Sequence, residues 1–194
     1  MISKVSVFCS SSSLAGEVYR DAVRDLATLL VENNILVQYG GGDVGLMGHL
    51  ADTVIKNKGK IRGIIPEFMV KEGWRHHGVK DMDIVETMSE RKKLIMTDTD
   101  GIITLAGGFG TLEELSEAIT LKQLGLINIP IIILNTNGFY DEMFNFFRRM
   151  SAENLIREEH HKIWKEVKLP GEVITQLFNT PKWDAGKARK RAAI

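Results

Sequence analysis

The sequence predicts an α/β fold in which a doubly wound parallel sheet lies between two layers of helices. Three observations predict it. Short runs rich in Ile and Val alternate with longer amphipathic segments, the runs lack clean polar alternation, and glycine-rich turns follow several of them. Strands without alternation are typical of parallel sheets, which are buried on both faces. Strand–helix units joined by right-handed crossovers then give a Rossmann-like three-layer sandwich.

Six short apolar runs are the expected strands. The third is stopped by Pro66, and the fourth is short. In chain order they span residues 4–9, 35–39, 60–65, 83–86, 101–105 and 130–134. A serine-rich turn, residues 10–13, follows the first of them.

Seven segments show the spacing of an amphipathic helix. The first, residues 16–33, has apolar residues at helical spacing at Val18, Ala22, Leu26, Leu29 and Leu30. The others span residues 44–57, 89–99, 111–124, 140–150, 152–160 and 171–178. Residues 68–81 are polar and are expected to be irregular.

Length and composition favour one domain. The chain of 194 residues balances 25 basic against 25 acidic side chains, so no global field indicates nucleic acid or a membrane surface. Residues 1–180 are expected to form the domain. Residues 181–194, with Lys187, Arg189, Lys190 and Arg191, are expected to be a solvated basic tail; a nucleic-acid role for it is the less favoured alternative. No apolar run reaches the ~18 residues of a membrane span, and a cytoplasmic location is expected.

A glycine turn follows the fifth expected strand. Gly107, Gly108 and Gly110 lie between that strand and a helix that begins near Thr111. Strand, glycine turn and helix start are typical of a phosphate site, because free N–H groups and the helix dipole favour an anion. Glu114 lies about one turn inside the helix. A carboxylate would repel phosphate, so Glu114 is a catalytic candidate.

A second glycine turn, residues 40–48, follows the second expected strand. Gly40, Gly42 and Gly45 match G-x-G-x-x-G, and Glu67 lies after the next strand, as in a dinucleotide-binding fingerprint. The alternative is a tight turn that packs helix on strand without a ligand. Two glycine turns in one sheet favour a compact ligand held on two sides, so we expect a mononucleotide or sugar phosphate with Gly42 and Gly45 at its site.

The helix expected from Ser89 begins with cations. Ser89 is the expected cap, and Arg91 and Lys92 then fall in the first turn, where the helix dipole disfavours positive charge. Either these side chains serve a ligand, or they form a solvated basic face paired with Glu90 or Asp98.

Metal and thiol chemistry are not expected. Four of the five histidines occur as two adjacent pairs, His76-His77 and His160-His161, whose members do not face one another on a helix. Cys9 is the only cysteine and is expected to be a buried structural thiol. The eight methionines and Trp164 are expected to fill the core.

These motifs together resemble the LOG ("Lonely Guy") family of cytokinin riboside 5′-monophosphate phosphoribohydrolases, long labelled "possible lysine decarboxylases". The family pattern P-G-G-x-G-T-x-x-E is met from Gly107 to Glu114, M-x-E-R-K from Met88 to Lys92, and G-G-G-x-x-G-L-M-G from Gly40 to Gly48. The resemblance covers about residues 4–180. It implies a Rossmann-like fold, a homodimer with the site near the interface, and hydrolysis of a nucleoside 5′-monophosphate to free base and ribose 5-phosphate.

The resemblance also implies roles for individual residues. Arg91 and Glu114 would be the catalytic pair. The substrate-binding residues would be Lys92, Gly108, Phe109, Gly110, Thr111, Leu112, Glu113 and Thr120. No metal or cofactor is implied, because a lysine decarboxylase would need pyridoxal phosphate on a lysine and no lysine here is marked for that task.

Four positions depart from the family pattern. The proline before the two glycines is Ala106, an acidic substrate position falls on Gly73 beside Glu72, a tryptophan is Leu121 and a basic residue is Ile129. These changes bear on the base pocket and the dimer contact, and they leave the preferred base open. Two other functions stay open: a non-catalytic nucleotide or cofactor carrier, and a dinucleotide enzyme that uses residues 40–45.

Overall fold

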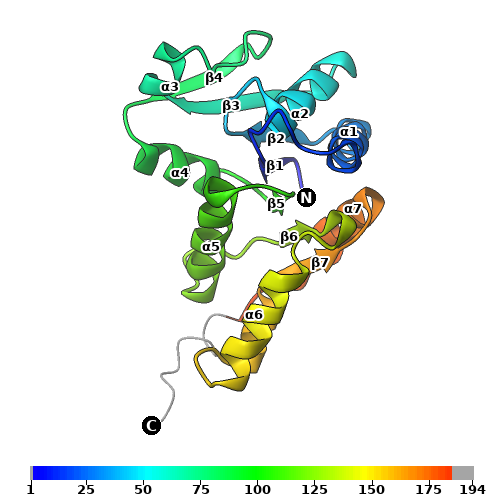
Figure 1. The fold of residues 1–194 in the computed structure, drawn as a ribbon, viewed down its shortest axis with the longest axis vertical. Helices are drawn as coiled ribbons and strands as arrows, with labels where there is room; N and C mark the ends of the chain where they lie inside the picture. Colours follow the sequence, from blue (N-terminus) through cyan, green and yellow to red (C-terminus); the bar gives the residue numbers. More distant parts are fainter. Residues whose placement is uncertain (1, 185–194) are drawn as a thin grey trace.

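The computed structural model describes residues 2–184, and a parallel seven-stranded sheet runs through them in the order β4-β3-β2-β1-β5-β6-β7 (Figure 1). Strand β1 is central, with Val7 beside Tyr39 of β2 and Ile103 of β5. The chain moves outward from β1 to β4 and then returns to place β5 on the other side of β1, which confirms the doubly wound topology. The strands are β1 Lys4–Phe8, β2 Leu36–Tyr39, β3 Ile61–Pro66, β4 Asp81–Val85, β5 Ile102–Thr104, β6 Ile131–Leu134 and β7 Lys165–Val167.

Helices cover both faces of the sheet. One core cluster joins the sheet to α1, α2 and α7, and a second joins it to α4, α5 and α6. In Figure 1 the first set lies to the right of the sheet and α4 and α5 to the left. The helices are α1 Glu17–Glu32, α2 Gly45–Lys56, α3 Glu67–Lys71, α4 Met88–Thr97, α5 Phe109–Gln123, α6 Asp141–Ala152 and α7 Pro170–Asn179, with 3-10 turns η1 Thr136–Gly138 and η2 Glu158–Lys162.

Alternate residues of one strand belong to different cores. In β1, Val5 and Val7 face the first cluster, whereas Phe8 faces the second. Strand β6 does the same with four fully buried side chains. Both faces are apolar because both are covered, which explains the absence of polar alternation in the sequence.

Helix α4 begins earlier than expected. Its N-cap is Thr87, not Ser89: the Thr87 hydroxyl accepts a hydrogen bond from the Glu90 N–H at 3.1 Å, and the Glu90 carboxylate accepts one from the Thr87 N–H at 3.3 Å. This capping box moves Arg91 into the second turn. The dipole therefore penalises Arg91 less than the sequence suggested.

The expected helix over residues 152–160 is wrong. Helix α6 ends at Ala152, and Asn154 adopts a positive φ of 58°, which breaks the helical path. The short helix α3 lies in the segment expected to be irregular, and β7 was not expected because its three residues include one buried apolar side chain. Residues 181–184 carry no helix or strand, and Trp183 packs against the second core cluster. The four basic residues of the expected tail lie outside the described residues.

Candidate active site

A cavity of about 510 Å³ lies at the carboxyl edge of the sheet, where β1, β2 and β5 end. The turns after these three strands all contribute to its wall: Ser10, Ser11 and Ser12 after β1, Gly40 and Gly42 after β2, and Gly108, Phe109, Gly110 and Thr111 after β5. The Ser10 N–H donates to the carbonyl of Ala106 at 3.1 Å and so joins the first turn to the third. Topology brings the three turns together, because carboxyl ends of parallel strands share one edge of the sheet.

The turn after β5 presents backbone to this cavity. A Cβ at Gly107 would lie 2.1 Å from Oγ1 of Thr111, so only glycine lets the turn close on the helix. Gly108 is the N-cap of α5, and Cβ atoms at Gly108 or Gly110 would meet nothing within 4 Å. The first N–H groups of a helix have no intrahelical acceptor, so this open end is suited to an anion.

In the turn after β2, Gly45 has a packing role. Gly45 has φ +64°, and a Cβ there would lie 2.5 Å from the carbonyl carbon of Ser11. The Met47 N–H also donates to the Ser10 carbonyl at 3.2 Å. Gly45 therefore packs the serine turn against α2 and does not line the cavity, which favours packing over the dinucleotide fingerprint at this position.

A buried ion pair forms one side of the cavity. Nη1 of Arg91 lies 3.0 Å from Oε1 of Glu114, and the two residues are only 5% and 4% exposed. Arg91 belongs to α4, and Glu114 lies on the inward face of α5. Nε of Arg91 donates to the carbonyl of Ile64 at 3.2 Å, which fixes the plane of the guanidinium. Burial raises the pKa of Glu114 and Glu113 raises it further, whereas Arg91 opposes the rise.

Several residues that the resemblance implied do not line the cavity. Lys92 pairs with Glu113 and, at 2.8 Å, with Glu117, so it bridges α4 and α5. Thr120 donates to the carbonyl of Ser116 at 2.8 Å. Leu112, Glu113 and Thr120 lie on the exposed side of α5.

The structure adds residues that the sequence left out. Three methionines expected in the core, Met47, Met69 and Met88, line the cavity, and so does Trp74. Trp74 lies in the segment expected to be irregular, which two backbone hydrogen bonds join to the second glycine turn: the Asp43 N–H donates to the Trp74 carbonyl at 3.1 Å, and the His76 N–H to the Gly41 carbonyl at 2.9 Å. No local pattern in the sequence reports such long-range pairing.

Cys9 lines the same cavity at 1% exposure. Burial raises the pKa of its thiol, the charge of Glu114 adds to the rise, and Arg91 opposes it. A neutral, buried thiol is a poor nucleophile, as expected for a structural cysteine.

The family departures lie around the cavity, not in it. Ala106 is buried, Gly73 has a positive φ of 78° that disfavours a side chain, and Glu72 ends α3 on the surface. Leu121 and Ile129 pack against the second core cluster. None of the five is among the cavity-lining residues.

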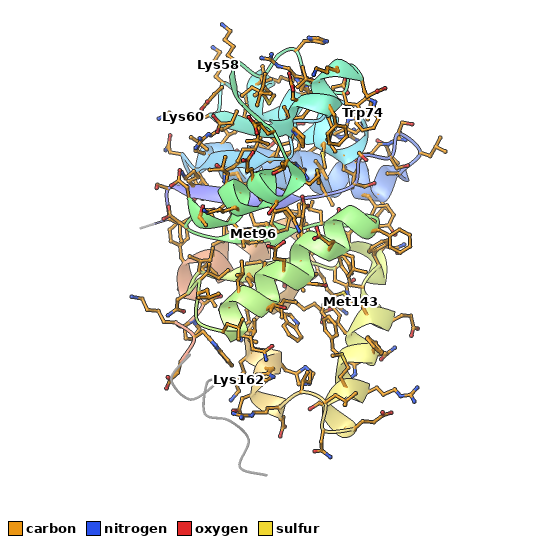
Figure 2. All side chains as sticks on the ribbon, turned by 90° about the vertical axis from the view of Figure 1, so that its left-hand side faces the viewer. Lys58, Lys60, Trp74, Met96, Met143 and Lys162 are labelled. Atoms are coloured by element: carbon orange, nitrogen blue, oxygen red, sulfur yellow. The ribbon has the colours of Figure 1, made fainter. Side chains whose placement is uncertain are left out.

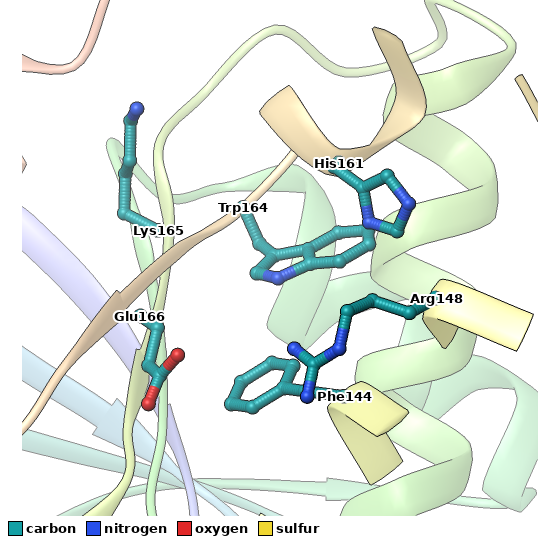
Figure 3. Close-up of a pocket in the computed structure, with 6 residues that line it drawn as sticks. All are labelled: Phe144, Arg148, His161, Trp164, Lys165 and Glu166. Carbon is teal, nitrogen blue, oxygen red and sulfur yellow. The ribbon is translucent and has the colours of Figure 1, made fainter. Parts of the chain in front are cut away.

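A second pocket, of about 260 Å³, lies between α6 and β7 (Figure 3). Its floor holds the aromatic rings of Phe144 and Trp164, and Arg148, His161 and Glu166 surround them. The residues that the sequence predicted for the site all lie elsewhere. Glu166 already accepts a hydrogen bond from Asn135 at 2.7 Å.

Two features that would indicate other chemistry are absent from the described residues. Within residues 2–184, no group of three or more His, Cys, Asp or Glu side chains is arranged to hold a metal ion. No helix in the described part of the chain is both long and apolar enough to cross a membrane.

Fold and cavity together define a Rossmann-like α/β protein whose glycine turns and buried ion pair meet at the carboxyl edge of its sheet. The family model described as "Possible lysine decarboxylase" matches residues 47–177. Two relatives are 38% identical over 160 residues, which is 82% of this chain: the probable cytokinin riboside 5′-monophosphate phosphoribohydrolase LOGL1 of Oryza sativa subsp. japonica and the cytokinin riboside 5′-monophosphate phosphoribohydrolase LOG2 of Arabidopsis thaliana. The aligned parts cover 72% and 75% of those proteins. The chain belongs to the LOG family.

Solved structures with the same fold carry other names. The molybdenum cofactor binding protein of Rippkaea orientalis superposes with a TM-score of 0.69 at 18% identity, and the molybdenum cofactor carrier protein of Chlamydomonas reinhardtii with 0.68 at 16%. Both matches cover 92% of this chain and 99% of the other. At these identities the likeness concerns the fold alone.

Proposed function

We propose that this chain hydrolyses the N-glycosidic bond of a nucleoside 5′-monophosphate and releases the free base and ribose 5-phosphate. The observation that carries the proposal is the buried pair of Arg91 and Glu114 on the same cavity as the open N-terminus of α5. The names of relatives at 38% identity support the same reaction.

The 5′-phosphate binds at the N-terminus of α5. The backbone N–H groups at Gly108 to Thr111 and the helix dipole stabilise its charge, and the open space at Gly110 lets phosphate oxygens approach the backbone. Ser10, Ser11 and Ser12 face the same cavity and supply hydroxyl groups. This end of the cavity holds the part that all nucleoside monophosphates share.

Glu114 then lies near the ribose. Cleavage of the C1′–N bond passes through an oxocarbenium-like state, and a carboxylate in a buried setting stabilises that positive charge. Glu114 also orients a water molecule whose oxygen bonds to C1′ while the C1′–N bond breaks. The electron pair of that bond leaves with the base, and the water proton ends on the base nitrogen.

Arg91 acts through charge, not through proton donation, because its guanidinium stays protonated. Nη1 contacts Glu114 and Nε donates to Ile64, whereas Nη2 lies beside Gly40 in the wall of the cavity. Nη2 is therefore the donor that contacts the phosphate or the departing base.

We further propose a homodimer that covers the exposed side of α5. Phe109, at the rim of the cavity, is 91% exposed, and Leu112, one turn on, is 38% exposed. A second copy on this side would shield both side chains. It would also bring Lys92, Leu112, Glu113 and Thr120, which do not line their own cavity, near the partner's site.

The two other functions are less well supported. Gly45 contributes packing and not ligand contact, which weakens the dinucleotide enzyme. A carrier gains little from a carboxylate buried beside a phosphate site, which weakens the carrier.

The experiment is a product assay with AMP and a panel of purine and pyrimidine monophosphates. We expect free base and ribose 5-phosphate in equal amounts. A chain that releases no base from any monophosphate, and whose melting temperature rises with NAD but not with AMP, would contradict the proposal and support the dinucleotide enzyme.

A further inference from the structure

The wall of the cavity divides by chemistry. On the β1 and β5 side it offers hydroxyl groups and backbone at Ser10, Ser11, Gly108 and Thr111, with the exposed Phe109 at the rim. On the side of β2, β3, the segment before β4 and the start of α4 it is apolar, with Val44, Met47, Ile65, Met69, Trp74 and Met88. A ligand with an anionic end and an apolar planar end matches this division.

Trp74 is the aromatic residue of the apolar part. Trp74 is 48% exposed, and Figure 2 shows it in the upper part of the molecule, away from Met143 of α6. A residue that is nearly half exposed and belongs to neither core cluster gains little from burial, so packing alone does not explain a tryptophan here. An open ring that lines a cavity can stack on a ligand.

The backbone beneath this ring is fixed. The Trp74 carbonyl accepts from Asp43, its N–H donates to the carbonyl of Met69 at 3.0 Å, and the next residue, Arg75, forms an antiparallel bridge with Gly42. The segment is thus tied both to α3 and to the glycine turn. A fixed backbone with an exposed ring gives a stacking surface that costs little entropy to order.

We propose that Trp74 is the specificity-determining residue on which the nucleobase stacks, and that the cavity recognises the base by its ring face and not by its polar edge. This inference rests on the proposed function. Apart from the indole N–H, the side chains of the apolar part carry no N–H or O–H group that could read the edge of a base.

The methionines fit the same role. Met47, Met69 and Met88 are unbranched and adaptable, and their sulfur atoms make favourable contacts with aromatic rings. Stacking tolerates different bases because every base has a π face. The expected selectivity is therefore for ring area, purines above pyrimidines, with adenine, hypoxanthine and guanine accepted within about tenfold of one another.

The first test compares Trp74→Leu, which removes the ring, with Trp74→Phe, which keeps one. We expect kcat/KM for AMP to fall roughly tenfold in Trp74→Leu and to stay within a few fold in Trp74→Phe. Inhibition by ribose 5-phosphate, which has no base, should be unchanged in both. Phe178→Ala on α7 is the control, since Phe178 is 52% exposed and lies outside the cavity.

The second test reads binding without turnover. With Glu114→Gln, in which turnover is slow, AMP should quench tryptophan fluorescence when Trp74 is present and not when Trp74→Phe is added, whereas ribose 5-phosphate should quench neither chain. If no monophosphate is hydrolysed, the proposed function fails, and this measurement still decides whether a base stacks on Trp74. An unchanged kcat/KM in Trp74→Leu, discrimination among AMP, IMP and GMP above a hundredfold, or AMP quenching that persists in Trp74→Phe would overturn the inference.

Discussion

A Cβ atom at Gly40 would lie 2.2 Å from Nη2 of Arg91, so the missing side chain at Gly40 leaves the space in which the guanidinium lies. The glycine motif at Gly40 and the basic motif at Arg91, which are far apart in the sequence, are thus in direct contact in the fold. The glycine turn after β2 holds open the position from which Arg91 reaches Glu114. Gly40 acts on the site through Arg91 and needs no contact with the substrate.

Gly40→Ala is therefore expected to fold but to lose activity. The added methyl group would meet the far end of a flexible side chain, so Arg91 would move and the backbone would not. We expect kcat to fall roughly a hundredfold with AMP, in line with the loss of one preorganised charged donor, while the melting temperature changes by a few degrees. Gly16→Ala is the control, because a Cβ at Gly16 meets only Tyr19 at 3.8 Å. If Gly40→Ala kept the wild-type kcat, the position of Arg91 would not matter for catalysis.

The pH profile should show the raised pKa of Glu114. If Glu114 works as a carboxylate, kcat falls as the pH drops through this pKa, so the midpoint of the acid limb should lie above 4.5, the ordinary value for glutamate. The phosphate of AMP also ionises, near pH 6. Inhibition by ribose 5-phosphate, followed over the same pH range, reports that ionisation alone. The role of Glu114 would be contradicted if the acid limb of kcat had its midpoint at or below pH 4.5. It would also be contradicted if that midpoint coincided with the midpoint for inhibition by ribose 5-phosphate.

Leu112→Glu should break the proposed dimer. Leu112 is 38% exposed and does not line the cavity of its own chain, so a charge there would disturb the proposed interface directly. We expect sedimentation equilibrium to give a dimer for the wild-type chain and a monomer for Leu112→Glu. Leu155→Glu is the control, at a 70% exposed position in the turn after α6. A wild-type chain that sediments as a monomer of 21.7 kDa would contradict the homodimer.

Lys122 should reduce stability at neutral pH. It is 1% exposed on the inward face of α5, and no carboxylate of residues 2–184 pairs with it. Burial, with a smaller effect from Lys165, lowers the pKa of Lys122 to about 8. The unfolded chain then binds a proton that the folded chain releases between about pH 8 and 10.5, so the free energy of unfolding should rise over that range.

Lys122→Met tests this effect by urea unfolding. The substitution removes the buried charge and keeps the length of the side chain, so it should stabilise the fold at pH 7 by on the order of 2 kcal/mol and abolish the rise above pH 8. Lys56→Met, on the exposed side of α2, should do neither. A destabilised Lys122→Met chain would mean that the ammonium group makes a favourable contact in the fold.

Most of the fold could be predicted because its signals are local. Runs of Ile and Val with both faces buried, and glycines at strand ends, mark the sheet and its carboxyl edge. Strand β7 could not be predicted, because Val167 is its one buried side chain and a three-residue edge strand has no period to detect. The prediction of a helix over residues 152–160 was wrong because the left-handed backbone conformation of Asn154 overrides local helix propensity.

Some residues of the candidate site could likewise be predicted from the sequence, and others could not. The motifs around Gly40, Arg91 and Glu114 converge because topology places their strands and helices at one edge. Trp74 could not be predicted from local pattern, since its place depends on hydrogen bonds to a turn about thirty residues away. Lys92, in contrast, was predicted from an intact motif but does not line the cavity. In the single chain its charge is paired with Glu113 and Glu117.

The most direct measurement is kcat for AMP in Glu114→Gln, with Glu142→Gln on the surface of α6 as the matched control. The substitution keeps the size of the side chain and removes the charge that contacts Arg91 and that we propose faces the ribose. We expect kcat to fall roughly a thousandfold, with ribose 5-phosphate inhibition within a few fold of wild type, and Glu142→Gln to be unchanged. Wild-type release of adenine by Glu114→Gln would contradict the assignment of Glu114 as the catalytic carboxylate.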